Sequence, residues 1–199
     1  MRADAIVFGI AGSLFGLIIG WVLGSQQAAR GGPIAAPVAQ SAPAQQSSTP
    51  AQPAPLDPAR VAAMQEVAAK DPKNAKSRVE LGNMFFDAEQ YPQSITWYEQ
   101  ALAIDSSDPN VSTDLGVAYY YMNQPDKALA QFDRSLAIDP KHIKTLLNVG
   151  IVRAFGKQDL AGAGKAWQQV VDLAPDSPEG MAAKKGLEGI KSAQGGGAK

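Results

Sequence analysis

Apolar residues recur every three or four positions through most of this chain, which is the spacing of helices with one buried face. The pattern predicts one helix over residues 59–70 and then three helix pairs, over residues 75–105, 109–139 and 143–173. A short segment with Pro, Asn or Gly breaks each pair in its middle. A last helix is expected over residues 178–192. All of these elements are helices, so we expect an all-α fold.

A glycine returns every 34 residues, at Gly82, Gly116 and Gly150, each time directly after a Leu or Val. An aromatic residue follows three positions after the first two glycines, at Phe85 and Tyr119. A fixed period of this length is typical of repeat architectures, in which no repeat buries its apolar face alone. We therefore expect the helix pairs to stack on one another, with glycine allowing the two helices of a pair to approach closely.

These positions resemble the tetratricopeptide repeat family, whose pattern is a Leu-Gly pair, an aromatic residue, Ala-x-x-x-Phe and a closing Pro. The middle repeat matches throughout, with Leu115, Gly116, Tyr119, Ala128, Phe132 and Pro140. The first repeat has Ser94 for the alanine, whereas the third has Arg153 for the aromatic residue and one inserted residue before Pro175. The resemblance implies an α-solenoid over residues 57–192, with repeats at about 75–108, 109–142 and 143–176 and a capping helix at 178–192.

An uncharged apolar run covers residues 5–24. As a helix it would span ~30 Å, the thickness of a membrane's hydrocarbon core. We therefore expect a transmembrane anchor over residues 1–25, in preference to a cleaved signal peptide, whose apolar core is shorter. The sparse Lys and Arg after Arg30 favour an N-terminus in the cytoplasm. The predicted location is a single-pass inner membrane protein with its C-terminal domain in the periplasm or otherwise outside the cytoplasm.

Small residues form a stripe along this predicted anchor, at Gly12, Gly16, Gly20 and Gly24. Such spacing favours membrane-helix packing, including pairing of two copies of the chain, although glycine is also simply common in membrane helices. Residues 26–56 consist mostly of Ala, Pro, Gln and Ser and predict a disordered linker that acts as a spacer. Residues 193–199 predict a flexible tail.

The composition excludes most catalytic chemistry. The chain has no cysteine and one histidine, His142, so no cluster of metal ligands or nucleophile–base pair is expected, and neither is a cofactor. The net charge is −1, and the basic residues alternate with acidic ones. A nucleic-acid-binding face requires clustered cations, so we expect no nucleic acid partner. The sequence predicts that the protein is not an enzyme.

The resemblance implies a concave groove, lined by the first helix of each pair, that binds a protein or peptide. The groove residues expected from the family geometry are Asn83, Phe86, Asn110, Thr113, Val117, Tyr120, Tyr121, Lys144, Leu147, Asn148, Ile151 and Phe155. They are partly aromatic and lightly charged, which suits a peptide with apolar anchors. Alternatively, aromatic residues such as Tyr121 and Phe155 complete the core between repeats. One subclass of the family holds a C-terminal carboxylate, but Asp114 at a matching position would repel it.

The function predicted from these features is a membrane-tethered interaction module that recruits a partner protein or peptide, as an adaptor or assembly factor. Its architecture resembles that of bacterial periplasmic repeat proteins that present apo-cytochromes for haem attachment in c-type cytochrome maturation. The alternative is a self-associating structural scaffold at the membrane, a homo-oligomer held by the glycine stripe and by repeat ends that dock on neighbouring copies.

Overall fold

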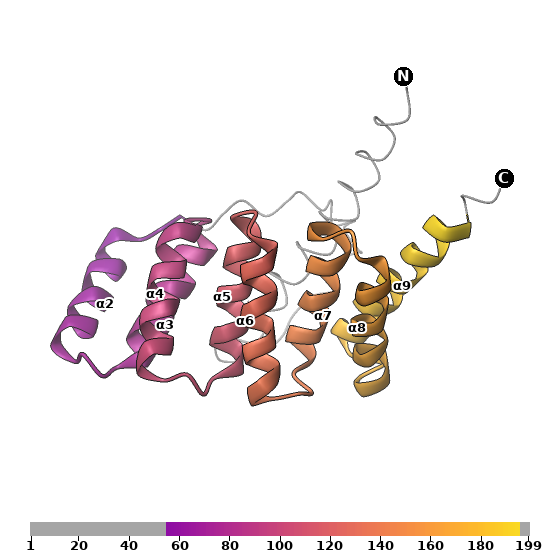
Figure 1. The fold of residues 1–199 in the computed structure, drawn as a ribbon. Coiled ribbons are helices and arrows are strands. Elements are labelled where there is room, and N and C mark those ends of the chain that lie inside the picture. The colour runs from indigo at the N-terminus through magenta and orange to yellow at the C-terminus, as the bar shows by residue number, and fades with distance from the viewer. Residues whose placement is uncertain (1–54, 196–199) are drawn as a thin grey trace, which may run out of the picture. The chain divides into compact units, whose positions relative to one another are not determined.

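The computed structural model describes residues 55–195, which belong to one of the chain's two compact units, Pro53–Lys199. These residues form eight α-helices and no strand, and the helices follow one another in chain order (Figure 1). The predicted anchor, its glycine stripe and nearly all of the predicted linker lie outside the described residues. Within residues 55–195, no helix combines the length and apolarity that a membrane span requires.

The helices lie close to the positions that the apolar pattern predicted. Helix α2 (Pro58–Lys70) precedes three pairs: α3 (Ala75–Asp87) with α4 (Tyr91–Ile104), α5 (Pro109–Tyr121) with α6 (Pro125–Ile138), and α7 (Ile143–Ile151) with α8 (Leu160–Leu173). Helix α9 (Pro178–Gly195) ends beyond the predicted Ser192, so the first residues of the predicted tail are helical. Leu56, the last residue of the predicted linker, is half-buried against the cluster formed by Val61, Ala68, Leu81 and Phe85.

Aspartate side chains begin several of these helices, as the Asp-Pro signals indicate. The Asp57 carboxylate accepts from the Ala59 N–H at 2.9 Å, and the Asp108 carboxylate accepts from the Asn110 N–H at 2.8 Å. The proline that follows each aspartate has no N–H to leave unpaired in the first turn. These caps satisfy backbone donors that have no partner within the helix.

The repeat glycines let the two helices of each pair approach closely. Each lies against a buried aromatic ring of the second helix, in the pairs Gly82–Tyr98, Gly116–Phe132 and Gly150–Trp167. A Cβ at Gly82 would lie 2.5 Å from two atoms of the Tyr98 ring, closer than real side chains come. Side-chain hydrogen bonds also connect adjacent repeats. For example, the Tyr119 hydroxyl of α5 donates to the Glu99 carboxylate of α4.

The third repeat accommodates its inserted residue in a π-helical turn, η1 (Val152–Gly156), directly after α7. Each helix pair reverses through one residue of positive φ, at Glu89 (57°), Asn123 (55°) and Gln158 (55°). The first two lie seven residues after the glycine of their repeat, whereas Gln158 lies eight residues after Gly150. The Lys157 N–H donates to the Val152 carbonyl, five residues back, at 3.0 Å. A π turn holds one residue more than an α turn, so the insertion leaves the following helix in register.

Candidate functional site

The predicted groove residues come from α3, α5, α7 and, for Phe155, the π turn η1, but the structure places them in different environments. Asn110 and Lys144 are exposed at the first turns of α5 and α7. Five are half-buried, namely Asn83, Val117, Tyr120, Tyr121 and Phe155. Another five are buried, namely Phe86, Thr113, Leu147, Asn148 and Ile151. The half-buried and exposed residues therefore form the accessible part of the predicted groove.

Four aromatic rings gather where the first two helix pairs meet; we call them the aromatic cluster (Phe86, Tyr91, Tyr120 and Tyr121). The Tyr91 and Tyr121 rings stack with centroids 4.6 Å apart and an interplanar angle of 2°. Phe86 meets both of them edge-on, at 5.4 and 5.8 Å. Tyr120 lies tilted beside Tyr121, with centroids 6.3 Å apart. Such contacts fix the rings before any ligand arrives.

Tyr91 is not among the groove residues predicted from the sequence, because those residues were all expected on the first helix of each pair. Tyr91 is the first residue of α4, the second helix of its pair, and it reaches Tyr121 across the boundary between repeats. Its place directly after the polar break between the two helices of the first pair is a signal that could have identified it. Burial raises the pKa of Tyr91 to about 12, with Glu89 adding to the rise, and burial also raises the pKa of Tyr120 to about 12. The cluster therefore presents neutral phenols over the whole physiological range.

Thr113 lies in a buried cluster of hydroxyls that joins the second and third repeats. Its Oγ1 donates to the Pro109 carbonyl at 2.7 Å and lies 3.0 Å from Ser135 Oγ and 2.6 Å from Thr145 Oγ1. All three side chains are at most 2% exposed. Each of these hydroxyls has its hydrogen-bond partners away from solvent, so Thr113 contributes to the core between repeats and not to an accessible surface.

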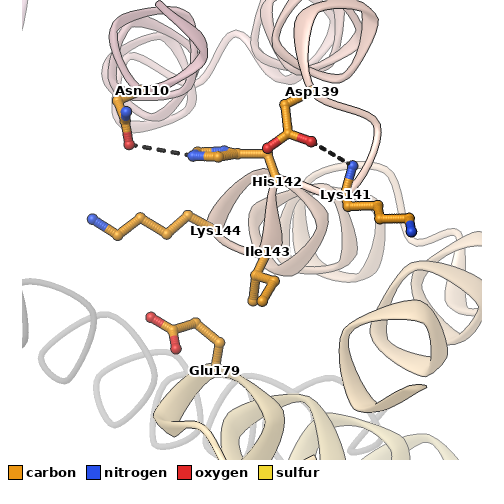
Figure 2. A pocket seen from close by; sticks show the side chains of 7 residues that line it. All are labelled: Asn110, Asp139, Lys141, His142, Ile143, Lys144 and Glu179. Atoms are coloured by element: carbon orange, nitrogen blue, oxygen red, sulfur yellow. Dashed lines mark hydrogen bonds between the residues drawn. The ribbon is translucent and has the colours of Figure 1, made fainter. Parts of the chain in front are cut away.

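His142, which contacts this cluster through Thr145, also lines an open pocket of about 360 Å³ (Figure 2). The pocket is lined by Asn110, Asp139, Lys141, His142, Ile143, Lys144 and Glu179. His142 Nε2 lies 3.2 Å from Asn110 Oδ1, and its Nδ1 lies 2.6 Å from Thr145 Oγ1. With Asn110 Oδ1 as the acceptor, Nε2 carries the proton and Nδ1 accepts from the Thr145 hydroxyl. The pocket combines cationic and anionic side chains, so its charge selects no single ligand.

Burial lowers the pKa of His142. Lys144 adds to this lowering, whereas Asp139 and Asp108 oppose it. The imidazole is therefore neutral at neutral pH, in agreement with a hydrogen bond accepted at Nδ1. Among residues 55–195, no three His, Cys, Asp or Glu side chains are arranged to hold a metal ion. The pocket thus offers hydrogen bonds and charges for binding.

Two of the amide side chains predicted for the groove bond within the repeats. The Asn83 carbonyl Oδ1 accepts from the Tyr98 hydroxyl at 2.7 Å, and Asn148 Nδ2 donates to the Lys144 carbonyl at 2.9 Å. Lys144, by contrast, extends its ammonium into solvent and forms no ion pair within the described part of the chain. Asn83 is therefore tied to the core ring of its own repeat, and the aromatic cluster remains the best-organised accessible feature.

Comparison with known families and structures agrees with the repeat geometry. A model described as "TPR repeat" matches residues 82–123, and one described as "Tetratricopeptide repeat" matches residues 110–142. Residues 82–142 carry tetratricopeptide repeats. No curated protein matches the chain. The two models cover the segment in which the glycine, the buried ring and the turn residue recur at fixed spacing.

Several solved structures, two of them tetratricopeptide repeat domains, share the fold. The first repeat domain of Spaghetti (RPAP3), bound to the HSP90 peptide SRMEEVD, is 26% identical with a TM-score of 0.57, over 63% of this chain and 96% of that one. The Sgt2 domain from Aspergillus fumigatus is 27% identical with a TM-score of 0.54, over 60% and 78%. MamA is 17% identical with a TM-score of 0.62, over 68% and 72%, a likeness of fold. Tetratricopeptide repeats are a protein-interaction fold, and these comparisons support an interaction module.

Proposed function

We propose that the repeats recruit a partner protein by binding a peptide segment along the side formed by α3, α5 and α7. The observation that carries this proposal is the aromatic cluster, in which half-buried rings from two repeats are fixed by mutual contact. Rings that are already ordered lose little conformational entropy on binding and supply large apolar contact areas. The peptide bound to the Spaghetti domain, a 26% identical relative, gives independent support.

We further propose that the module works at a membrane. The apolar run over residues 5–24 supports a single-pass anchor, and the Pro-rich segment after it supports a spacer that gives the repeats reach. An anchored module of this kind would concentrate a weakly bound partner at the membrane surface, as an assembly factor for extracytoplasmic proteins would require. Maturation of c-type cytochromes is one such role.

The anchor is tested by alkaline carbonate extraction of membranes that contain the full-length chain. We expect the chain to stay in the membrane pellet, and a variant that begins at Asp57 to appear in the soluble fraction. Added protease should digest the repeats only after the outer compartment is opened, if the repeats lie outside the cytoplasm. Complete release of the full-length chain by carbonate would refute the anchor and leave the peptide-binding proposal intact.

A self-associating scaffold is the second candidate, and it is favoured by the glycine stripe from Gly12 to Gly24. Photo-crosslinking in native membranes separates the two functions. Tyr120 is replaced with a photoreactive phenylalanine, and Lys127, which is exposed on α6, serves as the control position. Repeated capture of one foreign protein at Tyr120 supports the adaptor, and capture of the same chain supports the scaffold. Capture only at Lys127 would contradict binding at the aromatic cluster.

A further inference from the structure

We propose that the partner peptide carries a basic anchor, an arginine or lysine beside apolar residues, which packs on the stacked rings of Tyr91 and Tyr121 next to Glu89. This inference rests on the proposed peptide-binding function and names the chemistry of the partner. It differs from the acidic peptide SRMEEVD that is bound to the Spaghetti domain.

The stacked pair offers aromatic faces whose positions are fixed. Tyr91 belongs to α4 and Tyr121 to α5, so the stack spans the boundary between the first two repeats. Phe86, which is 8% exposed, supports both rings with its edge-on contacts. Both tyrosines are half-buried and keep part of their surface in solvent. A guanidinium or ammonium group favours the face of such a ring, and arginine also stacks on it in plane.

The charge beside the stack is negative. Glu89 lies in the turn between α3 and α4 with φ of 57°, and its N–H donates to the Phe86 carbonyl at 2.9 Å, which fixes its backbone. Its exposed carboxylate forms no ion pair with any residue between 55 and 195. The turn thus holds a carboxylate at the edge of the aromatic cluster without a cation to balance it.

The Glu89 carboxylate also acts on the pKa values of the two phenols. Burial raises the pKa of Tyr91 to about 12, and Glu89 adds to that rise. The pKa of Tyr121 is raised first by burial and then by Tyr91, Glu89 and Tyr120. No lysine or arginine in the described part of the chain is a cause of either shift. A partner's cation would therefore supply the missing positive charge, whereas an acidic peptide would be repelled.

The test is selection of a phage-displayed library of random dodecapeptides on the full-length chain in detergent micelles. We expect selected peptides to be enriched in Arg or Lys flanked by apolar residues. Glu89→Gln should remove most of this enrichment and weaken binding of the best peptide by up to about fivefold, the range of one partly exposed charge pair, because the aromatic rings stay in place. Glu89→Lys should select acidic residues instead. Glu188→Gln, at an exposed position on α9, is the matched control and should select as the unmodified chain does.

The possible outcomes separate the basic anchor from the proposed function. Enriched peptides without basic residues would overturn the basic anchor but support peptide binding. Basic enrichment that survives Glu89→Gln and Glu89→Lys would also overturn the assignment to this turn. The absence of any enriched peptide would contradict both proposals. Circular dichroism of each variant, with a melting temperature equal to that of the unmodified chain, shows that the selections compare folded proteins.

Discussion

At the scale of single residues, the packing of each repeat depends on a glycine that faces an aromatic ring. We predict that Gly116→Ala lowers the free energy of unfolding by about 1–3 kcal/mol, the usual cost of overpacking. The new Cβ would collide with the Phe132 ring and would lie 3.1 Å from the Ala128 carbonyl oxygen. Phe132 is fully buried, so its ring has no solvent side to move into. Urea unfolding followed by circular dichroism measures the change.

Gly189→Ala is the matched control for this substitution. Apart from its own helix backbone, no atom of residues 55–195 would lie within 4 Å of a Cβ at Gly189, and the residue lies inside helix α9. The replacement should therefore raise stability by up to about 1 kcal/mol through helix propensity alone. Equal destabilisation by the two substitutions would show that the rings do not explain the role of the repeat glycines.

Ser94 stands where the second and third repeats have Ala128 and Ala163, and its hydroxyl is a second test at this scale. The side chain is 0% exposed, and its Oγ has no hydrogen-bond partner within residues 55–195. We predict that Ser94→Ala raises the free energy of unfolding by about 1 kcal/mol, because a buried hydroxyl without a partner is costly. The same urea titration measures it.

Ser135 is as deeply buried as Ser94, but we expect Ser135→Ala to lower stability, not to raise it. Ser135 is also 0% exposed, but its Oγ donates to the Pro109 carbonyl at 2.9 Å within the hydroxyl cluster. Its replacement should lower stability by about 1 kcal/mol, since the bond is lost and Thr145 loses a neighbour. If both serine substitutions change stability in the same direction, hydrogen bonding is not what distinguishes these two sites.

His142 links stability to pH. Burial lowers its pKa, so the unfolded chain binds more protons at this position than the folded chain does. The free energy of unfolding should therefore fall as pH falls from about 7 through the ordinary histidine range near 6.5, until the lowered pKa of the folded state is passed. We predict that His142→Asn removes this part of the pH dependence. Urea titrations at pH 7.5, 6.5 and 5.5 measure it, and equal pH slopes for both proteins would contradict the prediction.

At the scale of elements, the π turn η1 explains how the third repeat differs in length from the others. Lys157 follows that turn, is exposed, and forms an ion pair with Asp126 at 2.7 Å on the surface. We predict that deletion of Lys157 lowers the melting temperature by only a few degrees, since the π turn then tightens to an α turn. Deletion of Met122, an exposed residue in the turn between α5 and α6, should lower the melting temperature much further, because the second repeat has no inserted residue to lose. Thermal melts compare the stability lost in the two variants. Equal melting temperatures would contradict the view that η1 holds the inserted residue of the third repeat.

The sequence predicted the helices well because they depend on local signals. The 34-residue glycine period, the Asp-Pro starts and the apolar spacing located each pair to within a few residues. The insertion was visible as a late Pro175, but its place in a π turn depends on how Val152 and Ala154 are buried, which spacing does not encode. Three members of the aromatic cluster were among the predicted groove residues, namely Phe86, Tyr120 and Tyr121. Tyr91 was not, because its contact with Tyr121 joins two repeats and is not encoded in the spacing of one repeat.

At the scale of the whole repeat domain, stability depends on how the array ends. Each repeat buries its apolar face against its neighbours, so a terminal repeat needs a helix with a polar outer side to cover it. At the C-terminal end that role belongs to α9, whose inner face consists of small buried residues, Gly180, Ala183 and Gly186. A Cβ at Gly186 would lie 2.6 Å from the Trp167 ring, so α9 lies directly on that ring.

Removal of α9 tests whether the array needs this cap. We predict that a chain ending at Asp176 melts at lower temperature, less cooperatively, and self-associates, because Trp167 (2% exposed) and Val170 (0%) on α8 lose their cover. Thermal melts and light scattering measure both effects. A chain ending at Ser192 loses only exposed described residues and should behave as the full-length chain does. A monomeric, cooperative chain ending at Asp176 would mean that α8 closes the array by itself. If the chain ending at Asp176 associates while the full-length chain stays monomeric, its self-association results from the uncovered end of the array. Such a result would not support the scaffold.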